Sequence, residues 1–303
     1  MILKAQTKWG WFIAAYLFLA GVGGGAYVTG AVAGFGGPEW TLISKIGVLL
    51  SFPCVGVGCL FLILDLGSPK NFWRSAMKPA TSWIARGTIV ITIFMILGVL
   101  HAGLWIWPSQ MLDTAQGLHT LISVLGILFA FGTMIYTGIL LGAARPLAFW
   151  STAMLPLLFL VSALSTGIMA VIFIGSLAGA AGHALLVLGK IDLLIILQEI
   201  FVLGFYLQAT HRVRESRASA RLVLAGSSAP LFWLGVVCLG LLVPLAFDLL
   251  TIYALSGPAG HTLGLLASCC GLLGGLFLRK VVLSGGIYAP LAAGRFEYAL
   301  TNI

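Results

Sequence analysis

The sequence is poor in charged residues. Only 8% of its 303 residues are Asp, Glu, Lys or Arg, and the acidic residues number eight. Soluble domains use roughly 25% charged residues to cover their surface. This composition therefore excludes a soluble enzyme, a nucleic-acid-binding protein and a disordered chain. Hydrophobic residues make up 60% of the chain, which indicates that lipid is its main solvent.

The sequence also lacks a cysteine motif for a metal. Cys54, Cys59, Cys238, Cys269 and Cys270 all lie in apolar runs, and none of them has C-x-x-C spacing. Adjacent cysteines cannot easily bind one metal together. We therefore expect no metal site and no iron–sulfur cluster in this chain.

Long apolar runs predict about eight membrane-spanning helices, since one span needs about 20 apolar residues. The predicted spans lie near residues 9–33, 41–64, 86–107, 117–142, 152–175, 184–210, 229–250 and 261–283. We expect an all-α integral membrane protein with one transmembrane domain over residues 1–303, arranged as two four-helix bundles. The first apolar run is longer than a signal-peptide core, so we expect it to be retained.

Basic residues are distributed unequally between the two sides of the membrane. Eight spans place both termini on one side, which holds 14 of the 16 Lys and Arg. They are Lys4, Lys8, Lys70, Arg74, Lys78, Arg86, Arg145, Arg212, Arg214, Arg217, Arg221, Arg279, Lys280 and Arg295. The positive-inside rule then predicts that the termini and basic loops are cytoplasmic in the cell membrane. A basic face is also suited to docking an acidic subunit.

Ionisable residues inside the predicted spans are functional candidates, because each is costly in hydrocarbon. Asp192 and Glu199 lie two helical turns apart on the sixth span, so their carboxyl groups point the same way, about 10 Å apart. They form either a proton relay that continues toward His183 or a structural pair neutralised by a basic neighbour. Asp65 and Asp248 close the second and seventh spans.

Four histidines fall at span ends opposite the basic loops: His101, His119, His183 and His261. Two histidines on facing helices would suit a b-type haem. Histidines at the interface more often contact headgroups or water. We therefore predict no haem in this chain, with a haem-bearing cytochrome b anchor as an alternative.

Five segments, in order along the chain, resemble the NrfD/PsrC family, the quinone-reactive membrane subunits of polysulfide reductase-like complexes. They are WGWFIAAYLFL (9–19), DLGSPKNFW (65–73), YTGILL leading to RPL (136–147), LPLLFL leading to STG (155–167), and FWLGVV leading to LVPL (232–245). Each segment is short, but together they extend over most of the chain.

The resemblance implies an eight-helix subunit of a respiratory oxidoreductase complex. Such a subunit exchanges electrons between the quinone pool, menaquinone or ubiquinone, and a docked four-cluster iron–sulfur subunit. A molybdopterin or multihaem catalytic subunit lies beyond that partner. The chain itself is then without haem and without activity toward the terminal substrate. Proton translocation coupled to anaerobic respiration is left open.

The resemblance implies that the quinone pocket contains Tyr16 of the first span and Tyr136 of the Tyr-Thr-Gly segment. The helical rise places their depths at about 10 Å and 13 Å from the basic face, which are similar. Asp65 and Arg86 lie at that face, where they would pair with each other or contact the quinone. Trp11 either walls the pocket or anchors the span at the interface.

The main alternative is an ion or solute transporter, because eight helices with intramembrane acids can also move a solute. The sequence shows no inverted repeat and no matching pair of broken helices. It does not determine the terminal substrate or the direction of electron flow.

Overall fold

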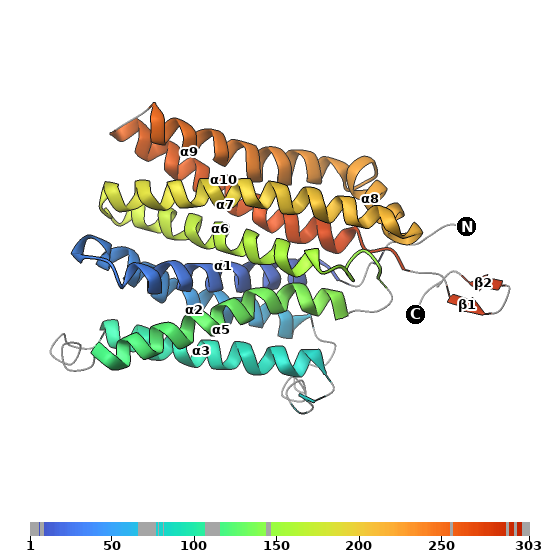
Figure 1. Cartoon of the computed structure of the whole chain (residues 1–303), viewed down its shortest axis with the longest axis horizontal. Helices are drawn as coiled ribbons and strands as arrows, with labels where there is room; N and C mark the ends of the chain where they lie inside the picture. The colour runs from blue at the N-terminus through green and yellow to red at the C-terminus, as the bar shows by residue number, and fades with distance from the viewer. Residues whose placement is uncertain are drawn as a thin grey trace.

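The computed structural model describes residues 6, 9–65, 77, 79–80, 82–106, 116–143, 147–254, 257–288, 291–293 and 296–298. Helices make up nearly all of this part of the chain (Figure 1). The long helices are α1 (Trp11–Ala33), α2 (Thr41–Leu64), α3 (Trp83–Ile106), α5 (Gln116–Ala143), α6 (Met154–Leu177), α7 (Gly182–Ala209) and α10 (Pro258–Ser284). The shorter elements are η1 (Pro38–Trp40), η3 (Thr210–Arg212), α8 (Arg214–Ala225), η4 (Leu231–Leu242), α9 (Val243–Tyr253) and the antiparallel strands β1 (Leu291–Ala293) and β2 (Phe296–Tyr298).

The prediction of an all-α membrane protein with about eight spans is confirmed. Seven helical segments of the described chain are long and apolar enough to cross a membrane. The eighth, α7, has 28 residues and carries Lys190, Asp192 and Glu199. Its length exceeds the roughly 20 residues that a span needs. The protein is therefore an all-α, multi-pass membrane protein, in which helices satisfy the backbone hydrogen bonds away from water.

The seventh span changes its hydrogen-bonding pattern halfway. Its first part, η4, is π-helical and passes into the α-helix α9 at Val243. Pro244 lies in the first turn of α9 and has no N–H to donate, so the regular bonding is interrupted at this point. Gly240 of η4 packs directly on Gly274 of α10, because a side chain at either position would overlap the other backbone.

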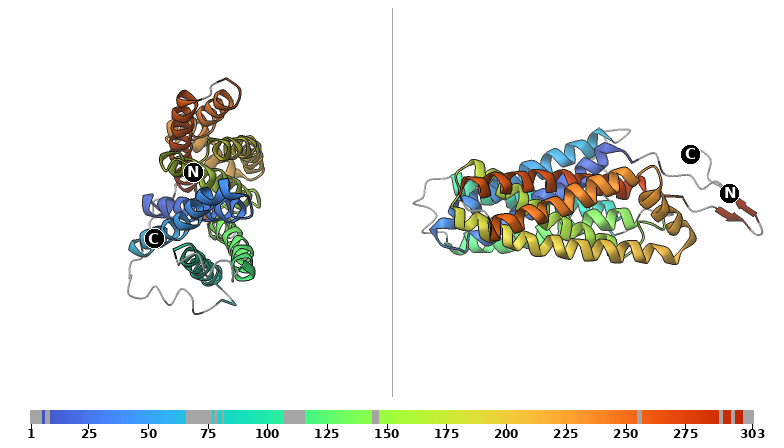
Figure 2. Two further views of the ribbon diagram at one scale, coloured as in Figure 1. Left: turned by 90° about the vertical axis from the view of Figure 1, so that its left-hand side faces the viewer. Right: turned by 90° about the horizontal axis from the view of Figure 1, so that it is seen from above.

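The helices form two groups of four, as expected. In the first, α1 packs on α2 and α5, and α3 packs on α2 and α5. In the second, α10 packs on α6, η4 and α9, and α7 packs on α6 and α9. Contacts of α1 with α6 and α10, and of α5 with α6, join the two groups (Figures 1 and 2).

Small residues permit the closest contact between the groups. At Gly25 of α1, an added Cβ would lie 2.1 Å from the Ala163 carbonyl oxygen of α6. At Gly167 of α6 it would lie 2.3 Å from the Gly25 carbonyl carbon. The glycine cluster of the first span thus serves helix packing, as is common in membrane bundles.

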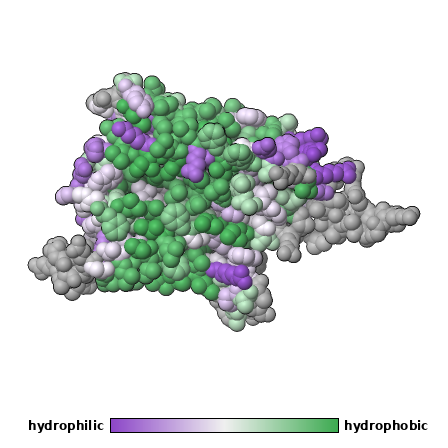
Figure 3. Space-filling model, viewed as in Figure 1, coloured by the Kyte–Doolittle hydropathy of each residue, from purple (hydrophilic) through white to green (hydrophobic). Residues whose placement is uncertain are grey.

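The two ends of the chain lie together. The Gln6 N–H donates to the Gly286 carbonyl at 2.8 Å, and the first helix begins and the last ends on the side where α8 lies (Figure 1). An apolar surface covers the middle of the visible face, with hydrophilic residues toward its two ends (Figure 3). We call the end with α8 the terminal face and the other end the opposite face.

Helix α8 gives the terminal face its basic character. Ser216, Ser219, Ala220 and Val223 are buried against the bundle. Its three arginines are exposed: Arg214, Arg217 and Arg221. Several other predicted basic residues lie outside the described residues: Lys4, Lys8, Lys70, Arg74, Lys78, Arg145 and Arg295.

Arg279 lies toward the terminal face, as predicted, but it is not part of the exposed basic surface. This side chain is only 1% exposed and lies inside the second helix group. It falls within the predicted eighth span, where an arginine needs internal partners. Lys280, the next residue, extends outward over the Trp11 ring, with its Nζ 5.1 Å from the ring centroid.

Candidate functional site

Two tyrosines lie close together inside the first helix group. Tyr16 of α1 is fully buried, and its hydroxyl has no hydrogen-bond partner among the described residues. Tyr136 of α5 is 7% exposed. The two side chains lie near each other and near Cys59 of α2. The sequence predicted both tyrosines, and the structure brings them together.

Glycines on the remaining helices make room for the tyrosine pair. At Gly58 of α2, an added Cβ would lie 3.3 Å from the Tyr16 carbonyl oxygen. At Gly87 of α3 it would overlap the Tyr136 ring, 1.7 Å from Cζ. All four helices of the first group therefore contribute to this position. We call Tyr16, Cys59, Gly87 and Tyr136 the tyrosine cluster.

The unpaired Tyr16 hydroxyl is chemically informative. Leaving a buried hydroxyl without a partner costs about 1–3 kcal/mol. Such a group is well placed to donate to a carbonyl oxygen, or to accept from a hydroxyl, of a bound molecule. Tyr136 supplies a second hydroxyl from another helix.

The other predicted pocket residues do not join the tyrosine cluster. Trp11 is 51% exposed on the outside of the bundle, beside Lys280. Asp65 is exposed at the end of α2. Arg86 is also exposed; it donates to the carbonyls of Pro79 and Ala80, both at 2.8 Å. The expected ion pair between Asp65 and Arg86 is absent from the described part of the chain.

A second set of polar residues lies inside the second helix group. Arg279 of α10 donates to the Ser162 hydroxyl and, at 3.3 Å each, to the carbonyls of Gly275 and Phe159. Glu199 of α7 interacts with Ser162 and with the Arg279 guanidinium. The buried arginine thus has a carboxyl group in its neighbourhood, although the two do not form an ion pair within 4 Å in the described part of the chain.

The polar set continues along α7 to Asp192. This carboxyl is 1% exposed and interacts with Ser165, Asp248 and Glu199. Its Oδ1 has no hydrogen-bond partner within the described residues. A small cavity of about 10 Å³ borders Ser165 and Glu199, close to the volume that one water needs. We call the series Arg279, Ser162, Glu199, Asp192 and Asp248 the polar track.

The structure places His183 apart from the polar track. It is exposed, and its Nδ1 lies 3.7 Å from the Glu39 carboxylate. Asp248 of α9, rather than His183, is the next ionisable neighbour of Asp192 toward the opposite face. Lys190 is exposed, so it does not neutralise Asp192 from inside.

Two of the four histidines on the opposite face, His101 and His119, are less exposed than expected. His101 is fully buried, with its Nδ1 2.8 Å from the Tyr27 hydroxyl and its Nε2 3.1 Å from Nε2 of His119. The interface role expected for His101 is therefore wrong. The described residues contain no group of three or more His, Cys, Asp or Glu that would hold a metal ion.

Sequence reasoning missed the roles of Arg279, Asp248, His101 and Tyr27. The first three fell inside predicted spans, and ionisable residues at such positions usually have partners inside the helix bundle. Their position in the sequence could therefore have indicated that they are buried. Tyr27 had no such signal, because tyrosine near a span end is common at membrane interfaces.

A family model described as "Polysulphide reductase, NrfD" matches residues 3–290. The chain belongs to the NrfD family. Two relatives share 29% identity with this NrfD-family chain over 92% of its length and 94% of their own. They are a polysulfide reductase component of Wolinella succinogenes and protein NrfD of Escherichia coli. A component of the selenate reductase of Mesobacillus selenatarsenatis is 24% identical over 80% of this chain and 67% of its own length.

Proposed function

We propose that this chain is the quinone-reactive membrane subunit of a respiratory oxidoreductase complex. It exchanges electrons between the quinone pool, menaquinone or ubiquinone, and a docked iron–sulfur subunit with four clusters. The observation that carries the proposal is the buried, unpaired Tyr16 hydroxyl beside Tyr136 in an NrfD-family chain. Two of the relatives are components of polysulfide and selenate reductases, which supports a role in a reductase complex.

The tyrosine cluster suits the chemistry of a quinone headgroup. Oxidation of a quinol releases two electrons and two protons, and its two oxygens need hydrogen-bond partners in both states. Tyr16 and Tyr136 each offer a hydroxyl that donates to the quinone or accepts from the quinol. The electrons leave toward the partner subunit, and the terminal substrate is converted in a further molybdopterin or multihaem subunit.

The terminal face is the proposed docking surface for the iron–sulfur subunit. Exposed arginines of α8 give it positive charge, which would steer an acidic partner into contact. By the positive-inside rule we propose that this face is cytoplasmic. Asp65 and Arg86 are exposed at the terminal face. We therefore propose that they contact the partner subunit rather than the quinone.

The polar track is the proposed route for coupled protons. Glu199 and Asp192 are consecutive on it, and a water-sized cavity borders Glu199 and Ser165. The route continues to Asp248 in place of the exposed His183. Protons would move along these groups while electrons leave the tyrosine cluster for the partner subunit.

The test compares Tyr16→Phe and Tyr136→Phe with Tyr253→Phe in the intact complex. Tyr253 is 82% exposed at the end of α9 and serves as the matched control. Each cluster variant is expected to weaken quinol binding about fivefold, since one hydrogen bond contributes about 1 kcal/mol. Tyr16→Phe should not lower the thermal stability of the quinone-free complex, because it removes an unpaired hydroxyl. Unchanged quinol oxidation kinetics in both cluster variants would refute the proposed pocket.

A further inference from the structure

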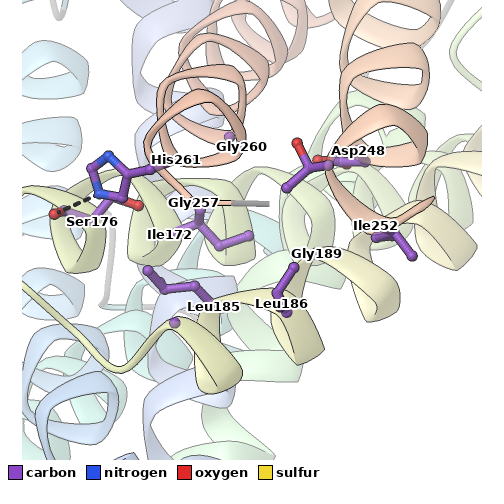
Figure 4. Close-up of a pocket in the computed structure, with 13 residues that line it drawn as sticks. Ile172, Ser176, Leu185, Leu186, Gly189, Asp248, Ile252, Gly257, Gly260 and His261 are labelled. Carbon is purple, nitrogen blue, oxygen red and sulfur yellow. Dashed lines mark hydrogen bonds between the residues drawn. The ribbon is translucent and has the colours of Figure 1, made fainter. Parts of the chain in front are cut away.

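A cavity of about 440 Å³ opens at the opposite face, between four helices of the second group. Its walls come from α6, α7, α9 and α10 near the ends of these helices. Figure 4 shows Asp248 and His261 from α9 and α10 on one side of this space and Leu185 and Leu186 from α7 on the other. The tyrosine cluster contributes no residue to it.

Asp248 is the chemically distinctive residue of this cavity. Its side chain is 7% exposed, yet its Oδ2 has no hydrogen-bond partner within the described chain. Thr251, one helical turn further on, also lines the cavity, and its buried Oγ1 lacks a partner among the same residues. Both residues line the cavity, and each keeps one buried oxygen without a partner among the described residues, which leaves the cavity wall short of a hydrogen-bond donor.

The other ionisable groups around Asp248 do not supply that donor. His261 of α10 lines the cavity, but its Nε2 lies 3.1 Å from the Ser176 carbonyl of α6. From α7, Asp192 interacts with Asp248, but it is a carboxyl group, and Glu199 is a further carboxyl group beyond it. Lys190 is exposed and does not line the cavity. The donor for Asp248 therefore has to come from outside the described part of the chain.

Water is the donor that the position favours. Asp248 lies five residues before the end of α9, about 8 Å along the helix axis from that end. Water at the cavity wall offers hydrogen bonds to the polar residues that line it, Asp248 and Thr251, whereas an acyl chain offers none. Glycines at the cavity wall keep it open: Gly182, Gly189, Gly257, Gly260 and Gly264.

The cavity also meets the inner end of the polar track. Asp248 interacts with Asp192, whose Oδ1 is likewise without a partner among the described residues. A pair of neighbouring carboxyl groups can hold one proton between them and pass it on.

We propose that this cavity is a water-filled inlet through which protons from the opposite face reach Asp248 and then Asp192. Hydronium gives its proton to the Asp248 carboxylate and leaves water in the cavity. Asp248 then passes the proton to Asp192, and no electron moves in either step. The inference rests on the proposed proton route, but it makes no use of the quinone pocket.

The first test asks whether the cavity contains water. Gly264→Cys and Gly189→Cys place a thiol at its wall, where no described atom lies within 4 Å of an added Cβ. Leu266→Cys is the control, because Leu266 is 52% exposed on the same helix and does not line the cavity. The probe is a membrane-impermeant anionic methanethiosulfonate, applied to vesicles that contain the whole complex in either orientation.

We expect the reagent to modify both cavity cysteines from the opposite face, at least about tenfold faster than Leu266→Cys, since only hydrated thiols ionise and react. The wild-type complex, with its five native cysteines, is the blank. A neutral maleimide that reacts with all three variants shows that each thiol is intact. Equal rates for the cavity and control positions would show that lipid fills the cavity and would overturn the proposal.

The second test separates the inlet from the quinone chemistry. Asp248→Asn keeps the size of the side chain and removes the proton-accepting carboxylate. We expect proton uptake from the opposite face to fall at least about tenfold, while quinol oxidation in the presence of an uncoupler is retained. Unchanged proton uptake would refute the role of Asp248. If quinol oxidation in the presence of an uncoupler is slowed in Tyr16→Phe but not in Asp248→Asn, that result supports the proposed function, even if the cavity proves not to be a proton inlet.

Discussion

At the scale of single residues, Gly87 controls the position of the Tyr136 ring. A methyl group at this position would overlap the ring, so Gly87→Ala must displace it. Such overpacking costs about 1–3 kcal/mol. We expect weaker quinol binding, measured as a raised KM in the intact complex.

Gly103→Ala is the matched control for this prediction. Gly103 lies on the same helix, and no described atom is within 4 Å of an added Cβ. It should leave quinol oxidation and thermal stability unchanged. A Gly87→Ala complex with wild-type kinetics would show that Tyr136 does not contact the quinone.

Glu199 interacts electrostatically with the buried Arg279, and this interaction makes a prediction about stability. Glu199→Gln removes the acidic group that interacts with the Arg279 guanidinium, and the loss is expected to stay below the roughly 3–5 kcal/mol of a broken buried ion pair, because the two groups are not in direct contact. We expect a clearly lower midpoint of thermal unfolding in detergent. The double variant with Arg279→Gln removes both charges and should recover most of the loss. A single variant as stable as the wild type would contradict the interaction.

The site residues that could be predicted from the sequence were those in a family segment or those with a charge inside a predicted span. Tyr16 and Tyr136 followed from the family segments, and Asp192 and Glu199 from charge inside a span. The pairing of Asp65 with Arg86 was predicted only because both lie on the same face. In the structure, Arg86 instead donates hydrogen bonds to two backbone carbonyls. Side-chain direction at a helix end depends on the neighbouring chain, which hydropathy does not report.

At the scale of elements, the spans were predictable because hydrocarbon thickness fixes their length. The predicted ends differ from the observed helices by no more than three residues. The π-helical part of the seventh span was not predicted. It depends on Pro244 together with the close contact of Gly240 with Gly274, and this contact joins two distant segments.

Helix α8 carries the next prediction, which concerns docking. Arg214→Glu together with Arg221→Glu reverses two exposed charges on the terminal face. We expect the iron–sulfur subunit to associate about tenfold more slowly, with weaker salt dependence, because electrostatic steering is lost. Reconstitution of the complex from its separated subunits measures this rate. Arg217 is left unchanged because it donates to the His211 carbonyl at 2.8 Å and holds the local turn.

Lys190→Glu is the control for the α8 variant, since Lys190 is exposed and lies on α7 toward the opposite face. This change should leave the association rate unaltered. An equal loss of rate in the control, or no loss in the α8 variant, would show that the partner does not dock on the basic helix.

At the scale of the whole molecule, the two helix groups divide the proposed work. The first holds the tyrosine cluster, and the second holds the polar track and the cavity at the opposite face. The groups meet at close glycine contacts between α1 and α6. Composition and span number predicted the all-α architecture, but the division depends on which helices pack together, and only the folded chain reports that.

The central claim is that electrons pass from a quinol at the tyrosine cluster to the docked iron–sulfur subunit. The most direct test is rapid mixing of the oxidised, intact complex with menaquinol while cluster reduction is followed by freeze-quench EPR. We expect cluster reduction in the wild type and in Tyr253→Phe, and at least about tenfold slower reduction in the double variant Tyr16→Phe and Tyr136→Phe, which loses two hydrogen bonds. Equal reduction rates in all three complexes would contradict the claim.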